Sequence, residues 1–155
     1  MEFSGDQRGG TFAGRDLSGA VFRDADLYRV SFAGANLENA AFLNCFAAEA
    51  SFKKARCAGI QAVHTSFYRA GFRGADLTDA LFWKCVLAGS DFRGAKVKRL
   101  TLTLDCNSFE GIQLDRATSA ELAYLFGRAH SPHGKRWLDI LGERDVVWLE
   151  RVFAR

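Results

Sequence analysis

The side chains that most often do chemistry are few in this sequence and widely spaced. The histidines are His64, His130 and His133, and the cysteines stand at positions 45, 57, 85 and 106. No two cysteines have Cys-x-x-Cys spacing and none has a histidine at metal-ligand spacing, so neither a zinc site nor a redox motif is predicted. No nucleophile-base-orienter set or Gly-rich phosphate loop is recognisable. We expect no catalytic residue, no metal, no cofactor and no enzymatic activity, and we expect buried, reduced, space-filling thiols.

A five-residue period determines which other side chains can meet. Every fifth residue from 12 to 102 is apolar: of these 19 centre positions nine are Phe and six are Leu, and the others are Ala47, Cys57, Ala62 and Val97. Two residues before each centre is a small position, and ten of these are Ala. A period of five fits neither a helix nor a strand, so the pattern predicts a solenoid of stacked coils.

Several units resemble the A-[D/N]-L-x-x consensus of the pentapeptide-repeat family, among them those around Leu27, Leu37 and Leu77, and the register extends from residue 10 to about 109. The resemblance implies an all-β solenoid, a right-handed quadrilateral β-helix of about five coils with four pentapeptides per coil. Centre and small positions would then point inward and the other three positions outward. With twenty residues per coil, one internal ladder is predicted to contain Phe12, Phe32, Phe52, Phe72 and Phe92.

The outward positions form vertical columns on four faces. Lys53, Arg73 and Arg93 share the first face, and Arg56, Lys96 and Lys98 the next. Such a basic column is either a solubilising surface or a contact for an anion such as nucleic acid phosphate, and any polyanion contact is expected to be weak. The third and fourth faces carry an apolar group that is too large for a bare monomer surface. Either the C-terminal helices fold back over it, or a second subunit or a partner protein covers it, and we favour a candidate interface. Its residues are Val21, Leu43, Val63, Leu81, Trp83, Tyr28, Phe46, Tyr68 and Val86.

Helical spacing replaces the five-residue period near the C-terminus. Thr118-Ser119-Ala120-Glu121 has capping-box spacing and predicts a helix over about 119–129, Ser131-Pro132 begins a second that ends near Gly142, and a third is expected over about 143–154. We therefore divide the chain into a repeat domain, 1–117, and a C-terminal helical segment, 118–155. The segment is expected to cap the open solenoid end, to form a homodimer contact, or both, and the candidate contact residues are Trp137, Trp148, Val152 and Phe153.

These observations favour a non-catalytic scaffold that binds a protein partner or a second copy of itself through its outer faces. The alternative is mimicry of DNA: the resemblance implies it, because known family members protect type II topoisomerases such as DNA gyrase from antibiotics or toxins in this way. The charge argues against it, because the chain carries +3 overall and residues 1–117 hold 15 Lys or Arg against 13 Asp or Glu, whereas a duplex mimic should be strongly negative. A polar N-terminus without a signal-peptide pattern, and the lack of a long apolar run, predict a cytoplasmic protein with no membrane contact.

Overall fold

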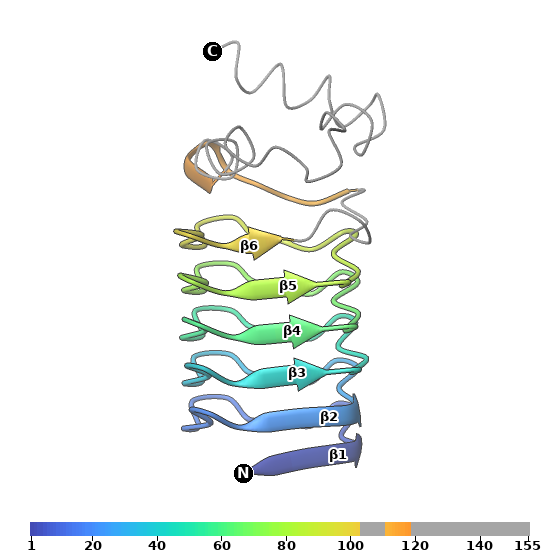
Figure 1. Cartoon of the computed structure of the whole chain (residues 1–155). Helices are drawn as coiled ribbons and strands as arrows, with labels where there is room; N and C mark the ends of the chain where they lie inside the picture. Colours follow the sequence, from blue (N-terminus) through green and yellow to red (C-terminus); the bar gives the residue numbers. More distant parts are fainter. Residues whose placement is uncertain (103–110, 119–155) are drawn as a thin grey trace.

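Short parallel strands lie one above the other along one side of the molecule (Figure 1). The computed structural model describes residues 1–102 and 111–118. Its single sheet has the order β1-β2-β3-β4-β5-β6, so each strand pairs with the next along the chain. The strands are β1 (Glu2–Asp6), β2 (Val21–Asp26), β3 (Ala41–Leu43), β4 (Gln61–Val63), β5 (Leu81–Trp83) and β6 (Thr101–Leu102).

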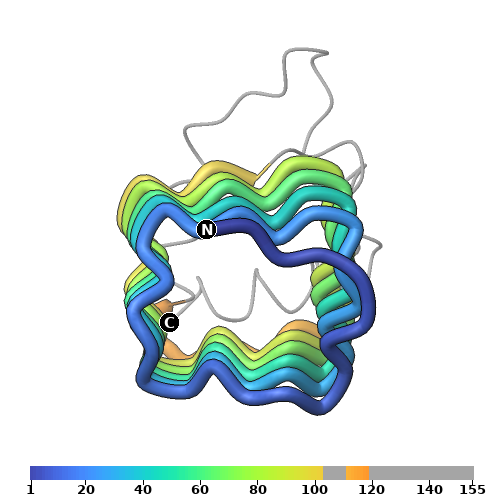
Figure 2. The backbone as a smooth tube through the Cα atoms, turned by 90° about the horizontal axis from the view of Figure 1, so that it is seen from below, coloured from blue at the N-terminus to red at the C-terminus, as the bar shows by residue number. Residues whose placement is uncertain are grey.

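Between β2 and β6 the register advances by twenty residues per coil. Phe22 pairs with Phe42, Phe42 with Ala62, and Ala62 with Phe82. Isolated bridges repeat the same spacing on the other sides, and the coils trace a square when viewed along the axis (Figure 2). The predicted all-β solenoid of about five coils is confirmed. We call the sides face 1 (residues 10–14), face 2 (15–19), face 3 (20–24) and face 4 (25–29), each with its equivalents every twenty residues.

The inside of the square is filled by the centre and small positions. The five Phe residues of the ladder are buried and stack face to face, with ring centroids 5.3, 5.0, 4.8 and 4.9 Å apart from Phe12 up to Phe92. Phe12, Phe32, Phe52 and Phe72 also meet rings of neighbouring faces edge-on, an arrangement that aromatic quadrupoles favour. Phe22 and Phe42 on face 3, for example, are perpendicular to Phe32. The filled volume is conserved where the pattern changes: Ala62 is small for a centre position, and the larger Ile60 is buried beside it at a small position.

Three small positions on one inner column do more than fill space. Cys45, Thr65 and Cys85 are buried, and each donates a side-chain hydrogen bond to a carbonyl one coil below: Cys45 to Phe22 at 3.3 Å, Thr65 to Phe42 at 3.1 Å and Cys85 to Ala62 at 3.4 Å. Cys45 and Cys85 are buried, as expected, and their hydrogen bonds add to the space that they fill. Thr65 separates the two thiols in this column.

The ends of the solenoid depart from the predicted register. At the N-terminus β1 adds strand pairing below β2, and an irregularity between Phe3 and Gly5 shifts its register by one residue. This shift places Phe3 on Phe22, with ring centroids 4.8 Å apart. At the other end Gln113 pairs with Asp91, a spacing of 22 residues. Residues 111–114 thus add a partial coil above face 1, beyond the residues that the five-residue period covers.

A helical turn follows this partial coil at residues 116–118. Its N-cap is Asp115, whose Oδ1 accepts the backbone N–H of Thr118 at 2.8 Å. Thr118 was predicted to be the N-cap itself and instead lies three residues inside the cap; its hydroxyl donates to the Phe92 carbonyl at 3.3 Å. The helices expected over 119–154 lie outside the described residues, as do Trp137, Trp148, Val152 and Phe153. None of the described residues belongs to a helix of the length and apolar character needed to cross a bilayer.

Candidate binding surfaces

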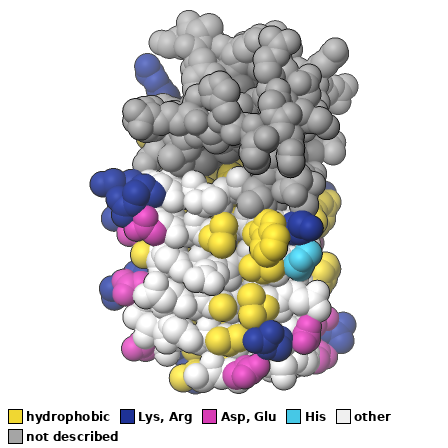
Figure 3. Space-filling model, in the orientation of Figure 1, with side chains coloured by type: hydrophobic (Ala, Val, Ile, Leu, Met, Phe, Trp, Pro, Cys, Tyr) yellow, Lys and Arg dark blue, Asp and Glu magenta, His cyan; other side chains and the backbone are white. Residues whose placement is uncertain are grey.

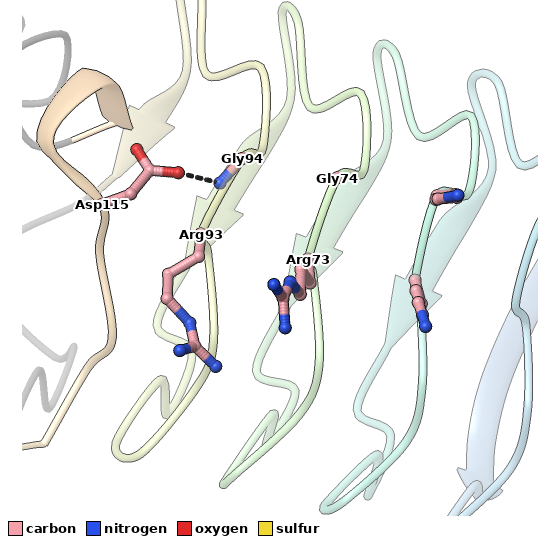
Figure 4. Close-up of a pocket in the computed structure, with 7 residues that line it drawn as sticks. Arg73, Gly74, Arg93, Gly94 and Asp115 are labelled. Atoms are coloured by element: carbon pink, nitrogen blue, oxygen red, sulfur yellow. Dashed lines mark hydrogen bonds between the residues drawn. The ribbon is translucent and has the colours of Figure 1, made fainter.

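Face 1 carries the predicted basic column. Lys53, Arg73 and Arg93 are exposed at equivalent positions of three successive coils, and Figure 4 shows the Arg73 and Arg93 side chains lying along neighbouring coils in the same direction. They border a shallow depression of about 330 Å³ that we call the basic hollow, whose lining residues are Lys53, Lys54, Arg73, Gly74, Arg93, Gly94 and Asp115.

One member of the basic column, Arg93, is paired with an acid. Asp91 accepts Nε and Nη2 of Arg93 at 2.9 and 2.7 Å. These hydrogen bonds lower the pKa of the Asp91 carboxyl. The predicted column compares only residues that are twenty apart in the sequence. Asp91 is two residues before Arg93 in the same pentapeptide, and both flank the inward Phe92. Lys53, Lys54 and Arg73 form no ion pair with any described residue.

The upper end of the basic hollow is closed by the carboxylate of Asp115. Its Oδ2 accepts the backbone N–H of Gly94, the bond drawn in Figure 4. Elsewhere in this corner the corresponding N–H donates to a carbonyl of the coil above, as Gly74 does to Arg93 at 3.1 Å. Hydrogen bonds from the Thr118 and Gly94 backbone lower the pKa of Asp115. No feature of the repeat pattern pointed to Asp115, because the return of the chain to face 1 was not predicted.

Face 2 is not a basic surface. Arg56 forms an ion pair with Glu38, and Lys96 pairs with Asp76 at 3.6 Å. Arg99 at the next corner pairs with Asp79. Three cations of this face are therefore paired with acids, whereas Lys98 is exposed and forms no ion pair with a described residue.

The predicted apolar group lies on faces 3 and 4. Figure 3 shows hydrophobic side chains gathered along the strand side of the molecule. The most exposed large members are Phe46 at 49%, Trp83 at 43% and Tyr68 at 41%. We call the group the aromatic surface; its other members are Val21, Tyr28, Leu43, Val63 and Leu81, which are half-buried, and Val86, which is exposed.

Charged groups frame the aromatic surface. Lys84 Nζ lies 5.7 Å above the Trp83 ring, and His64 is beside it with ring centroids 6.1 Å apart. On face 4 Tyr28 stacks on Phe46 with centroids 6.1 Å apart. Below them Arg29 binds Glu49 at 2.7 Å, which lowers the pKa of Glu49. Rigid aromatic side chains with a polar rim are typical of surfaces that bind proteins.

Catalysis by a thiol or a bound metal depends on the ionisation of the cysteines and on the spacing of possible metal ligands among the described residues. Burial raises the pKa of the Cys57 and Cys45 thiols, so neither is a ready thiolate nucleophile. No three His, Cys, Asp or Glu side chains gather in residues 1–102 and 111–118 at a spacing that could hold a metal.

The four-sided parallel solenoid of five-residue units defines the structural class of this protein. The family model described as pentapeptide repeats matches eight copies, at residues 11–42 and 70–104. Together with the unbroken register of the intervening residues, this match confirms the predicted resemblance and identifies residues 11–104 as pentapeptide repeats. The unmatched segment contains three of the least typical centres, Ala47, Cys57 and Ala62.

Solved structures with the same fold include a pentapeptide repeat protein from the Arabidopsis thaliana thylakoid lumen. The two are 22% identical over 90% of this chain and 77% of that one, with a TM-score of 0.50. QnrB1, a plasmid-mediated fluoroquinolone resistance protein, is 19% identical over 83% of this chain and 97% of its own, with a TM-score of 0.39. HetL from the cyanobacterium Nostoc, involved in heterocyst differentiation regulation, is 17% identical over 73% and 84%, with a TM-score of 0.25. No curated protein sequence matches.

Proposed function

We propose that this protein is a non-catalytic scaffold that binds a protein partner, or a second copy of itself, through the aromatic surface. The observation that carries the proposal is the exposure of Phe46, Trp83 and Tyr68 on adjoining faces of a rigid solenoid. A rigid support means that little conformational entropy is lost when these rings are buried by a partner. The rings also lie among half-buried aliphatic side chains, so a partner would meet a continuous apolar area rather than isolated residues.

Mimicry of DNA remains the weaker alternative. The positive net charge opposes it, and the ion pairs of face 2 leave no continuous acidic surface there. A homodimer through the C-terminal residues and a cytoplasmic location also remain predictions, to be checked by sedimentation of the whole protein and by cell fractionation.

Site-specific photo-crosslinking in cells of the source organism tests the proposal. A photoreactive amino acid replaces Trp83 in the aromatic surface or, as the control, the exposed Lys98 on face 2. We expect crosslinked products from position 83 and few from position 98, with mass spectrometry identifying either another protein or the chain itself. Equal products from both positions, or none from position 83, would refute a docking role for this surface.

A further inference from the structure

The basic column breaks a charge pattern that the other faces keep. Elsewhere on the described residues, cations in one column are separated by acids: Glu49 lies between Arg29 and Arg69 on face 4, and Asp76 between Arg56 and Lys96 on face 2. On face 1 three cations follow in adjacent coils, at the strand spacing of roughly 4.8 Å. Like charges at this spacing repel, so an anion bound between them would relieve a cost that the fold avoids elsewhere.

The cations of the basic hollow exceed its acids. Lys53, Lys54, Arg73 and Arg93 face two nearby carboxylates, Asp91 and Asp115. Both carboxylates are engaged: Asp91 by Arg93, and Asp115 by two backbone N–H groups. Lys53, Lys54 and Arg73 form no ion pair with a described residue and are exposed beside the depression, although the charge of Arg73 helps to lower the pKa of Asp91.

The shape of the basic hollow limits the size of its ligand. The corners at Gly74 and Gly94 have no side chain, which leaves the surface open beside Arg73 and Arg93 (Figure 4). The column continues below Lys53 with Ala33 and Ala13, so the cations extend over only three coils. A volume of about 330 Å³ is at the small end of the range for small-molecule sites. A nucleic acid strand, by contrast, needs a long basic groove that follows its backbone.

We propose that the basic hollow binds a small polyphosphate group, such as the di- or triphosphate of a nucleotide, independently of the aromatic surface. Phosphates linked in a chain present several charges within a few ångströms, which suits cations stacked at the coil spacing. The planar guanidinium of Arg73 can bind phosphate oxygens in a bidentate manner, while Lys53 and Lys54 supply point charges at the lower edge.

Calorimetric titration of the full-length protein with inorganic triphosphate and with orthophosphate tests the assignment, in Tris buffer at low and at physiological ionic strength. We expect triphosphate to bind more tightly than orthophosphate, and its affinity to fall as salt rises. Arg73→Gln should weaken triphosphate binding by about tenfold, the loss of one charge-assisted hydrogen bond. Arg56→Gln makes the same change of charge outside the basic hollow and should leave the affinity nearly unchanged. Melting curves of both variants establish that they are folded.

Three results would overturn the proposal. Absence of triphosphate binding at millimolar concentration excludes the site. Equal loss in Arg73→Gln and Arg56→Gln shows attraction by overall charge rather than by the hollow. Tighter binding of a single-stranded oligonucleotide than of triphosphate, increasing with oligonucleotide length, assigns the surface to nucleic acid instead.

Discussion

Replacing Phe52 by alanine removes one ring from the middle of the Phe ladder. Phe52 is completely buried, stacks on Phe32 and Phe72 with centroids 5.0 and 4.8 Å away, and meets Phe42 and Phe67 edge-on at 5.7 and 5.8 Å. The walls around it are hydrogen-bonded coils, such as Phe52 N–H to Gly71 O at 2.7 Å, so they cannot collapse into the cavity. We therefore expect a loss of about 3–5 kcal/mol in the free energy of unfolding.

This loss is a large fraction of the stability of a typical domain, which is about 5–15 kcal/mol. At about 2–4 °C per kcal/mol for a chain of this length, the melting temperature should fall by roughly 6–20 °C. Urea and thermal unfolding followed by circular dichroism measure both quantities. Lys53→Ala is the matched control, because it changes the adjacent but exposed residue and should cost less than about 0.5 kcal/mol. Phosphate-free buffer is needed, since Lys53 lines the basic hollow.

Phe12→Ala tests whether the loss of stability is smaller at the end of the ladder than in its middle. Phe12 ends the ladder, meets three rings instead of four and is slightly exposed. It should therefore cost less than Phe52→Ala, because its site has fewer neighbours to lose and water can reach it. Equal unfolding midpoints for Phe52→Ala and Lys53→Ala, or a larger loss for Phe12→Ala than for Phe52→Ala, would refute the inward register.

Two further predictions concern polar contacts. Thr65→Val removes the hydroxyl that accepts the Cys45 N–H at 3.2 Å, and it should lower the free energy of unfolding in urea by about 1–3 kcal/mol. Thr65→Ser keeps the hydroxyl and should cost less. Equal losses in the two variants would exclude the hydrogen bond as the cause. Asp115→Ala removes the cap of Thr118 and the acceptor for Gly94 and should cost about 1 kcal/mol near pH 7. Because the folded-state pKa of Asp115 is lowered, its stabilisation is complete above pH about 4 and is lost as the pH falls through the folded-state pKa. A difference between variant and parent that does not shrink as the pH is lowered below about 4 would contradict this role.

The central coils were predictable because each residue of a repeat has one fixed direction. Once Phe32 and Phe52 are placed inward, the register also determines that Lys53 and Trp83 point outward. The ends were not predictable, because both depend on a shift in register. A one-residue irregularity places Phe3 on Phe22, and a 22-residue spacing places Gln113 beside Asp91. A constant five-residue period places the polar residues Glu2 and Gln7 at centre positions, so it predicts no coil there.

The surface columns were predictable, but their electrostatics were only partly so. Reading along a column finds partners twenty residues apart, such as Arg29 with Glu49. It does not find a partner two residues away, and Asp91 reaches Arg93 in that way because both flank the inward Phe92. Long side chains also cross between columns, as Arg56 does to Glu38. Which cation remains uncompensated therefore depends on rotamers and not on the repeat alone.

The position of the two candidate surfaces has a consequence for function. Faces 1 and 3 are opposite sides of the square coil (Figure 2). Arg73 of the basic hollow belongs to face 1 and Trp83 belongs to face 3, so these two residues lie on opposite sides of the solenoid. Face 4, which carries Phe46 and Tyr68, adjoins face 1, but a small ligand in the basic hollow would not reach Trp83 on the opposite side. The stack of coils between them offers no hinge through which one site could alter the other. The two sites should therefore act additively: a change at Trp83 leaves triphosphate affinity unaltered, and Arg73→Gln leaves crosslinking from position 83 unaltered. A protein built in this way is suited to hold a partner and an anionic ligand at the same time rather than to switch between them.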